Sequence, residues 1–321
     1  ETNAEYLNDC IEIMLAPNQQ KEALSGFYRV DDTHYERLKG IVNHFDYYKT
    51  VDEGFKKMKE RSFAICGISR DCEGALRDVM IPRVEELISH LGDYHICIFE
   101  NDSKISSGDD TATVLREWGS KHKDKSHIVC EELGWSRLGG TKPNRTNNLA
   151  KHRNKYLTYI YENFRHFDYM VVFDWDLTHG FSINGIAHSI ETFDNIDDWG
   201  AITAMAVNKR YQYYDAFTYR EVGNYRPYCR QILRAAHAQG SRQVGSDIVR
   251  IGSGFNALAI YNMKALCDTV DKQGPASGNG HSEQFGNLYG DGRNCEHVRV
   301  HAALDKCGYS VWLNPSLVVH Y

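Results

Sequence analysis

The sequence predicts an α/β fold built on a mixed, mainly parallel sheet flanked by helices, with a helical appendage at the N-terminus. From Ser62 onward, short continuous apolar runs alternate with stretches of helical periodicity. Such runs are typical of strands covered on both faces, and their alternation with helices is typical of a parallel sheet with right-handed crossovers. Polar and acidic residues directly follow several runs, at the sheet edge where ligands of such folds bind.

The composition is that of a folded protein without a strongly basic surface. Its 321 residues are enough for one large domain with an appendage. Hydrophobic residues make up 42% and charged residues 25%, as in globular domains. The net charge of -6 argues against a surface that coats nucleic acid, and no run approaches the roughly 18 apolar residues of a membrane span. We therefore expect no nucleic-acid partner and no membrane span in this chain.

The expected elements follow in order along the chain. Residues 1–60 have a helical spacing of apolar residues and form the appendage, and residues 61–321 form the main domain. Strands are predicted at 63–68, 95–99, 127–131, 168–173, 200–207, 254–261 and 310–313. Helices are predicted at 75–88, 111–120, 148–164 and just after residue 296. The stretch 274–292 contains six glycines among 19 residues and is predicted to be a loop.

Asp174 and Asp176 are the main candidates for a metal site. They flank Trp175 directly after the apolar run 169–173, and side chains two apart in an extended segment point the same way. Two carboxylates that leave room for diphosphate oxygens suit Mg²⁺ or Mn²⁺. Such an ion offsets the charge of a departing nucleoside diphosphate, which gives Asp176 a catalytic role as well. The alternative is a solvated aspartate pair in a turn.

Polar residues also follow the first two predicted strands. Ser69 and Arg70 come after the first strand, and Glu100 and Asp102 come after the second. If these strands cradle a nucleoside, Glu100 or Asp102 would accept hydrogen bonds from its hydroxyl groups. The alternative is a loop in which Asn101 and Asp102 only cap the following turn.

Three candidates lie at the helix that leads into the metal motif, namely Arg145, Arg153 and Asn154. Arginine stays charged and matches the geometry of phosphate oxygens. We therefore expect this group, and Arg153 above all, to bind the nucleotide. The alternative is ordinary surface charge on an amphipathic helix.

Two candidates lie near the C-terminus. Glu296 follows the glycine-rich stretch, where a carboxylate would take a proton from an attacking hydroxyl. The alternative is an acidic residue favoured in the first turn of a helix. His320 would complete the metal coordination if the tail folds back to the sheet edge, and otherwise it is an exposed terminal residue.

Three motifs, taken in order, resemble a known family. Phe-Glu-Asn-Asp-Ser at 99–103, Leu-Ala-Lys-His-Arg-Asn at 149–154 and the acidic motif at 172–176 are similar to motifs of the cryptococcal capsule-associated α-mannosyltransferases. The resemblance covers roughly residues 62–321. It implies a GT-A fold, which is a Rossmann-like α/β fold, together with a nucleotide-sugar donor and a divalent cation.

The resemblance implies a metal-dependent glycosyltransferase that moves a sugar from a nucleoside diphosphate to a hydroxyl of a glycan or glycoconjugate, with retention of configuration. Three alternatives stay open: an inverting enzyme with Glu296 as general base, a sugar nucleotidyltransferase, and a non-catalytic carbohydrate-binding protein. The segment 69–74 is acidic and poor in glycine, which disfavours the nucleotidyltransferase.

Nine cysteines without a CxxC pair are typical of free thiols in a protein core. This pattern slightly favours the cytoplasm over the lumen of the secretory pathway, where any membrane anchor would have been removed.

Overall fold

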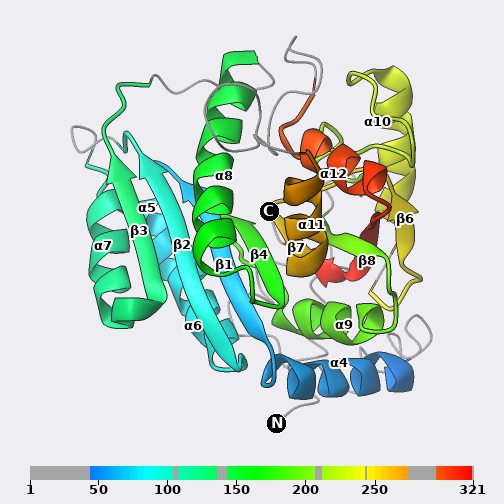
Figure 1. Cartoon of the computed structure of the whole chain (residues 1–321), viewed down its shortest axis with the longest axis horizontal. Helices are drawn as coiled ribbons and strands as arrows, with labels where there is room; N and C mark the ends of the chain where they lie inside the picture. The colour runs from blue at the N-terminus through cyan, green and yellow to red at the C-terminus, as the bar shows by residue number, and fades with distance from the viewer. Residues whose placement is uncertain are drawn as a thin grey trace, which may run out of the picture.

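The computed structural model describes residues 44–103, 108–135, 143–206, 212–242, 244–273 and 294–319. Within these ranges one sheet has the strand order β3-β2-β1-β4-β7-β5-β8-β6 and forms the centre of the molecule (Figure 1). The strands are β1 (Ser62–Ser69), β2 (Asp93–Asn101), β3 (Ser126–Glu131), β4 (Tyr169–Asp174), β5 (Trp199–Met205), β6 (Val249–Ile251), β7 (Leu258–Asn262) and β8 (Ser310–Val318).

The first half of the sheet is parallel and the second half is mixed. Strands β3, β2, β1 and β4 all run in the same direction. Strand β7 is antiparallel to both β4 and β5, β8 is parallel to β5, and β6 is antiparallel to β8. The predicted mixed, mainly parallel sheet is therefore confirmed, and the carboxyl ends of β1, β2 and β4 meet at one edge.

Helices cover both faces of this sheet. Their bounds are α4 (His44–Met58), α5 (Glu73–Ala75), a π-helical turn (Leu76–Met80), α6 (Ile81–Ile88), α7 (Thr111–His122), a 3-10 turn (Lys123–Lys125), α8 (Pro143–Asn163), α9 (Ile183–Phe193), α10 (Arg230–His237), a 3-10 turn (Ala238–Ser241), α11 (Met263–Gln273) and α12 (His297–Lys306). Alternate residues of β1 enter two separate cores, with Phe63 and Ile65 in one and Ala64 and Cys66 in the other. The first core is closed by α4, α6, α7 and α9, and the second by α8, α10, α11 and α12.

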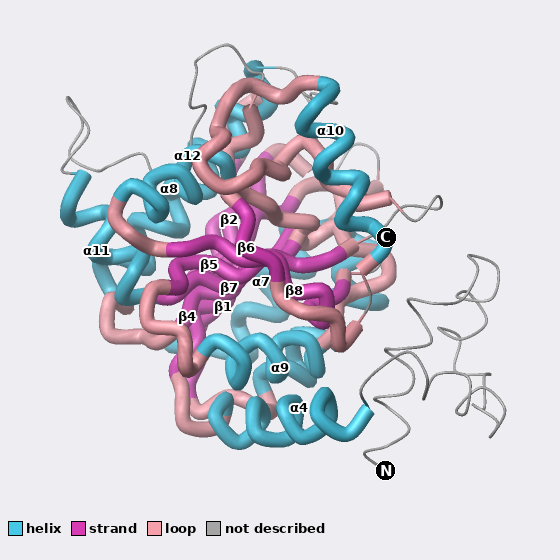
Figure 2. Tube along the Cα trace, turned by 90° about the vertical axis from the view of Figure 1, so that its right-hand side faces the viewer, coloured by secondary structure: helices cyan, strands magenta, loops and turns pink. Residues whose placement is uncertain are grey.

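Helix α4 lies beside α9 at one end of the molecule (Figure 2). It contributes Tyr47, Val51 and Met58 to the first core, all of them buried. The part of the expected appendage before residue 44 lies outside the described residues, so the division of the chain at residue 60 stays a prediction. None of the helices in the described ranges is long and apolar enough to cross a membrane.

Several element boundaries differ from the predictions. The strand expected at 254–261 begins only at Leu258, because Asn256 and Ala257 have φ values of 51° and 63° and turn the chain instead. The last strand continues from the predicted 310–313 to Val318. Helices α9, α10 and α11 and the three-residue strand β6 were not predicted. The expected loop at 274–292 lies outside the described residues.

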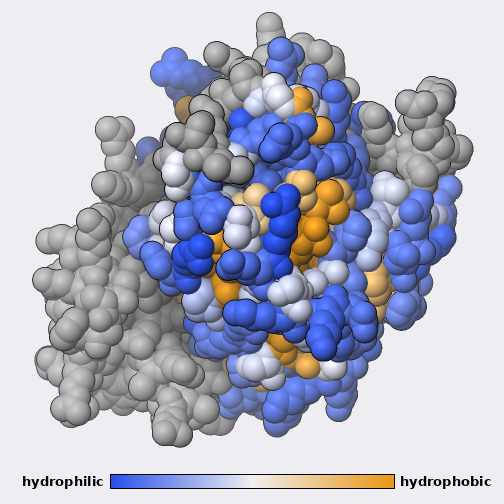
Figure 3. Space-filling model, turned by 90° about the vertical axis from the view of Figure 1, so that its left-hand side faces the viewer, coloured by the Kyte–Doolittle hydropathy of each residue, from blue (hydrophilic) through white to orange (hydrophobic). Residues whose placement is uncertain are grey.

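Strand β3 closes the sheet at one edge, and all six of its residues are partly exposed. The face of the molecule on this side is mainly hydrophilic, and its hydrophobic areas are small and separate (Figure 3). This edge therefore offers a polar surface rather than a broad apolar one.

Candidate active site

A cavity of about 380 Å³ opens beyond the carboxyl ends of β1, β2 and β4. This is the edge at which ligands of open α/β sheets bind. Seven of the candidate residues named from the sequence line the cavity: Ser69, Arg70, Arg145, Arg153, Asp174, Asp176 and Glu296. Residues that are far apart in the chain are thus brought together at one site.

The end of β4 determines where the two aspartates of the acidic motif lie. Asp174 is the last residue of this strand, and its backbone N–H donates to the carbonyl of Ala257 at 2.9 Å. Trp175 is fully buried and packs against Trp118, with ring centroids 5.5 Å apart. Because Trp175 turns into the core, Asp174 and Asp176 on either side of it both face the cavity.

Gly67 on β1 makes room for this indole. A Cβ atom at position 67 would lie 2.3 Å from Nε1 of Trp175 and 2.4 Å from the carbonyl oxygen of Phe173. Real Cβ atoms do not approach other heavy atoms this closely, so any side chain would displace the indole. The glycine on β1 therefore helps to place both carboxylates on β4.

We expect Gly67→Ala to destabilise the fold by about 1–3 kcal/mol, the usual cost of overpacking a core, and to abolish metal-dependent nucleotide binding. The matched control is Gly74→Ala, since a Cβ there meets nothing within 4 Å. Urea unfolding and calorimetric titration with Mn²⁺ and a nucleoside diphosphate measure the two effects. Equal stability of the two variants would contradict this role of Gly67.

Arg153 on α8 links the acidic motif to the C-terminal part of the site. Its Nη2 atom lies 2.9 Å from Oδ1 of Asp174, and its Nε atom lies 2.9 Å from Oε1 of Glu296. The guanidinium is almost fully buried and also lies over the ring of Phe255, 4.9 Å from the centroid. Burial lowers the pKa of Arg153, but Tyr156 and the paired acids on both sides outweigh burial and raise this pKa above its usual value. One cation thus bridges two carboxylates.

Negative charge nevertheless accumulates around Asp174. Burial raises the pKa of its carboxyl above the ordinary value, and the charges of Asp176 and Glu296 act in the same direction. The contact with Arg153 lowers this pKa and only partly compensates. An environment with more acids than cations is suited to binding a further positive charge.

Glu296 immediately precedes α12, which begins at His297, and its side chain makes no capping hydrogen bond to that helix. Its carboxylate is instead buried against Arg153, and Oε2 accepts from Sγ of Cys295 at 3.2 Å. The alternative of a simple helix-start acid therefore does not account for where this carboxylate lies.

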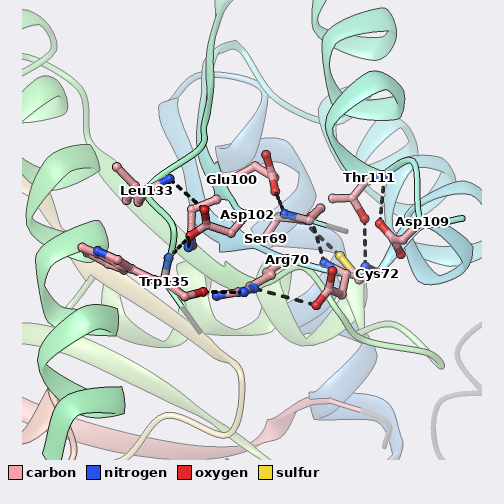
Figure 4. A network of polar contacts seen from close by, with 12 residues as sticks. Ser69, Arg70, Cys72, Glu100, Asp102, Asp109, Thr111, Leu133 and Trp135 are labelled. Atoms are coloured by element: carbon pink, nitrogen blue, oxygen red, sulfur yellow. Dashed lines mark hydrogen bonds and ion pairs between the residues drawn. The ribbon is translucent and has the colours of Figure 1, made fainter. Parts of the chain in front are cut away.

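Glu100 and Asp102 have neighbours other than those predicted. Oδ1 of Asp102 accepts from the backbone N–H groups of Leu133 and Gly134, both at 2.7 Å, and Oδ2 accepts from Trp135 (Figure 4). Glu100 is buried and accepts from the backbone N–H of Ser103 at 2.9 Å. Neither lines the cavity. These carboxylates organise the loops around the cavity, and the expectation that they contact a nucleoside directly stays a prediction.

Asp102 acts on the cavity through Trp135. The carbonyl of Trp135 accepts from Nη2 of Arg70 at 2.8 Å, and both residues line the cavity (Figure 4). Arg70, which follows β1, and the loop that follows β3 are thereby joined across β2. Of the remaining candidates, Arg145 lies in the cavity wall, whereas Asn154 does not.

Asp215 and His152 are cavity residues that were not among the candidates named from the sequence. Asp215 lies in a turn, where its backbone N–H donates to the side chain of Asn256. Burial raises the pKa of Asp215 to about 7, and the charges of Asp174 and Glu296 contribute. The tyrosine-rich sequence around Asp215 carries no motif, so only the tertiary structure identifies it.

The second such residue is His152 on α8. It is buried in the cavity wall beside Trp135, with ring centroids 5.0 Å apart, and burial lowers its pKa to about 4. Neither ring nitrogen has a hydrogen-bond partner among the described residues. A neutral imidazole is thus available to a ligand in the cavity.

The candidate metal site would consist of two carboxylates, Asp174 and Asp176. Within the described ranges no group of three or more His, Cys, Asp and Glu side chains is placed to hold an ion. The proposed third ligand, His320, lies outside the described residues. Two carboxylate oxygens in an open cavity fit Mg²⁺ or Mn²⁺, because these ions commonly take their other ligands from substrate phosphates and water.

Comparison with known proteins identifies the family. The family model described as Cryptococcal mannosyltransferase 1 matches residues 62–296, which include the acidic motif, Arg153 and Glu296. The chain belongs to this family. Membership in the Cryptococcal mannosyltransferase 1 family places the chain among glycosyltransferase enzymes and its sheet among GT-A folds. No curated protein matches the chain at a significant level.

Among the solved structures that are similar in part are two complexes with Mn²⁺ and a nucleotide or nucleotide sugar. The mannosyltransferase PcManGT from Pyrobaculum calidifontis, in complex with GDP-Man and Mn²⁺, is 11% identical with a TM-score of 0.42, and the match covers 85% of this chain and 65% of that one. Glucosyl-3-phosphoglycerate synthase from Mycobacterium tuberculosis, in complex with Mn²⁺, UDP and phosphoglyceric acid, is 13% identical with a TM-score of 0.45 and coverage of 84% and 73%. The chain thus spans less than two thirds of the first of these proteins.

Proposed function

We propose that this member of the Cryptococcal mannosyltransferase 1 family transfers a hexose or pentose from a nucleoside diphosphate to a hydroxyl of a glycan or glycoconjugate. The observation that carries the proposal is the meeting of Asp174, Asp176, Arg153 and Glu296 in one cavity at the carboxyl edge of the sheet. Such a cavity combines a site for a cation with fixed positive charge for phosphate. Transfer from a nucleotide sugar requires both, because the leaving group is a diphosphate.

We further propose that Asp174 and Asp176 hold Mn²⁺ or Mg²⁺. When bound, the ion supplies charge neutralisation to the diphosphate as it leaves. His320 stays a proposed third ligand. Asp176 is exposed while Asp174 is paired with Arg153, so the two carboxylates reach the cavity from different surroundings.

The two ends of the cavity support different roles. Arg70, Trp135 and His152 form the end next to β1 and β2, and we assign the nucleoside to it. Its neutral imidazole and indole offer a stacking surface and hydrogen-bonding groups. To Asp215 and Glu296, which also line the cavity, we assign the sugar and the acceptor hydroxyl.

For the stereochemistry we propose retention. Glu296 would be the general base of an inverting enzyme, but its Oε1 atom already accepts from Arg153 and its Oε2 atom from Cys295. These contacts favour a positioning role for Glu296 over proton abstraction. In a retaining enzyme no protein base opposite the leaving group is required, and the donor diphosphate itself takes the acceptor proton.

Inversion is a second candidate, with Asp215 rather than Glu296 as the base. The observation in its favour is that the pKa of Asp215 is raised to about 7, near the value that suits a general base at neutral pH. The anomeric configuration of the product, read by NMR before it equilibrates, decides between the two candidates.

The raised pKa of Asp215 predicts a pH-dependent effect on stability. The carboxyl titrates near pH 7 in the folded state and near its ordinary value of 3.8 in the unfolded state. The stability that the protonated carboxyl of Asp215 contributes to the fold is therefore fully present below pH 3.8, and it is lost as the pH rises through 7. We expect Asp215→Asn to be about 2 kcal/mol more stable than the wild type at pH 8, after allowance for partial exposure.

At pH 4 the same variant should be no more stable than the wild type. Denaturant unfolding at the two pH values measures the difference. A constant gap between variant and wild type across this range would contradict the raised pKa.

The function is tested by incubating the protein with Mn²⁺ and a panel of GDP- and UDP-sugars. Slow release of the nucleoside diphosphate from one of them, stopped by EDTA and restored by Mn²⁺, is the expected result. Release of pyrophosphate from a nucleoside triphosphate and a sugar phosphate would instead indicate a sugar nucleotidyltransferase. Glycan binding without turnover of any donor would indicate a non-catalytic carbohydrate-binding protein.

A further inference from the structure

A buried chain of polar side chains runs through the second core to Glu296. Oγ of Ser253 lies 2.9 Å from Nδ1 of His301, and Nε2 of His301 lies 3.1 Å from the hydroxyl of Tyr261. That hydroxyl lies 3.2 Å from Nδ1 of His297, whose Nε2 atom lies 3.9 Å from Oε1 of Glu296. The first four side chains are fully buried, and Glu296 is 3% exposed.

Both imidazoles in this chain are neutral. Burial lowers the pKa of His301 to about 3 and that of His297 well below its usual value, and Arg153 adds to the effect at His297. A neutral imidazole carries its proton on only one ring nitrogen. Each ring therefore donates from one nitrogen and accepts at the other. The hydrogen bonds along the chain could thus run in either of two directions.

The charge of Glu296 decides this choice at His297. If Nδ1 carried the proton, the lone pair of Nε2 would face a carboxylate oxygen at 3.9 Å, and the two would repel each other in a buried environment. With the proton on Nε2, an N–H faces the carboxylate. Nδ1 of His297 is then an acceptor.

The direction of each remaining hydrogen bond follows from Nδ1 of His297 being an acceptor. An acceptor at Nδ1 of His297 takes the only hydrogen of the Tyr261 hydroxyl. The oxygen of Tyr261 must then accept from Nε2–H of His301, which leaves Nδ1 of His301 to accept from the hydroxyl of Ser253. Both rings therefore carry their proton on Nε2.

We propose that Ser253, His301, Tyr261 and His297 form a one-way hydrogen-bond chain whose N–H end faces Glu296, and that they are positioning residues for this carboxylate. Phe255 supports the end of the chain, since its ring stacks on His297 with centroids 3.7 Å apart and also contacts the guanidinium of Arg153. The functional part of the inference rests on the proposed function of the cavity, whereas the direction of the chain does not.

The direction is tested by NMR on the full chain labelled with ¹⁵N-histidine. Long-range ¹H–¹⁵N correlations distinguish protonated from unprotonated ring nitrogens, and single His→Gln variants assign the signals. We expect Nε2–H forms at His297 and His301. His188 is an internal control in the other core: it is also neutral, and its Nδ1 accepts from Asn314 at 3.2 Å. An Nδ1–H form at His297 or His301 overturns the inference.

The positioning role is tested with Tyr261→Phe. Without the hydroxyl, His301 should shift toward its Nδ1–H form while His297 stays in the Nε2–H form, and kcat should fall about tenfold with an unchanged KM for the donor. Tyr169→Phe is the matched control, because Tyr169 is a buried tyrosine at the opposite end of β4 from Asp174. Wild-type kcat in Tyr261→Phe overturns the positioning role.

If Tyr261→Phe does not fold, Ser253→Ala is measured in its place. This variant removes the hydroxyl that donates to Nδ1 of His301, so the signals of His301 should change and kcat should fall about threefold. Unchanged signals and kcat overturn the inference. A wild-type protein with both Nε2–H forms but no transfer activity would contradict the proposed function and leave the direction of the chain established.

Discussion

Asp176→Asn is expected to lower the rate of sugar transfer at least about a thousandfold, or ~4 kcal/mol in the barrier, with little change in stability. The side chain is exposed at the cavity, so an isosteric amide costs the fold little. It does, however, remove one of the two carboxylates that hold the proposed cation. Initial rates of nucleoside diphosphate release at saturating Mn²⁺ measure the effect, and thermal unfolding checks the fold.

The matched control for this variant is Asp93→Asn. Asp93 is an exposed carboxylate at the start of β2, where it pairs with Lys125 at 2.7 Å. Removing it tests whether the loss of any surface carboxylate slows transfer. We expect wild-type rates from this control, and similar rates from the two variants would contradict the role given to Asp176.

Arg153→Met is expected to destabilise the fold by about 3–5 kcal/mol, because it leaves a buried carboxylate without its cation. Arg153 is the partner of Glu296, which is almost fully buried, and of Asp174. The matched control is Arg165→Met, whose exposed pair with Asp271 is screened by solvent and should contribute little to stability. Denaturant unfolding at neutral pH compares the two variants.

A double variant separates loss of charge pairing from loss of packing. Adding Glu296→Gln to Arg153→Met removes the unpaired charge, so it should recover part of the lost stability, about 1–3 kcal/mol as a coupling energy. Additive effects of the two substitutions would mean that Arg153 stabilises the fold only by filling space. Transfer activity should be absent both in Arg153→Met and in the double variant, because the positive charge beside Asp174 is gone.

The parallel half of the sheet was predictable because its strands are short continuous apolar runs. β1, β2 and β4 are buried almost throughout, and such runs have few alternatives between helical segments. The antiparallel half was less predictable. Strand β6 has only three residues, and the start of β7 depends on two left-handed residues, Asn256 and Ala257, neither of which is glycine.

The site could be predicted for residues that lie at the end of a strand or directly after it. Asp174 and Asp176 line the cavity as the rule about carboxyl edges predicts, and Arg153 reaches it from α8, the helix that leads into β4. The same rule places Glu100 and Asp102 at this edge, but it does not predict whether a side chain turns to the cavity or to a neighbouring loop. Their carboxylates bind backbone N–H groups instead.

Asp215 is a cavity residue that no sequence motif predicts. It enters the cavity through long-range contacts, among them the hydrogen bond from its backbone to Asn256, and nothing near it in the sequence marks it as functional. The hydrogen-bond chain behind Glu296 was likewise not predictable from the sequence. Ser253, Tyr261 and His301 come from separate segments, and only packing places them in line.

The central claim is that Asp174 and Asp176 hold a cation that binds the donor diphosphate. The most direct test is a crystal structure with Mn²⁺ and a nucleoside diphosphate, with the ion located by its anomalous scattering. We expect an anomalous peak about 2.0–2.3 Å from oxygens of both aspartates, with diphosphate oxygens among the other ligands. A bound diphosphate with the peak elsewhere, or with neither aspartate in contact with the ion, would contradict it.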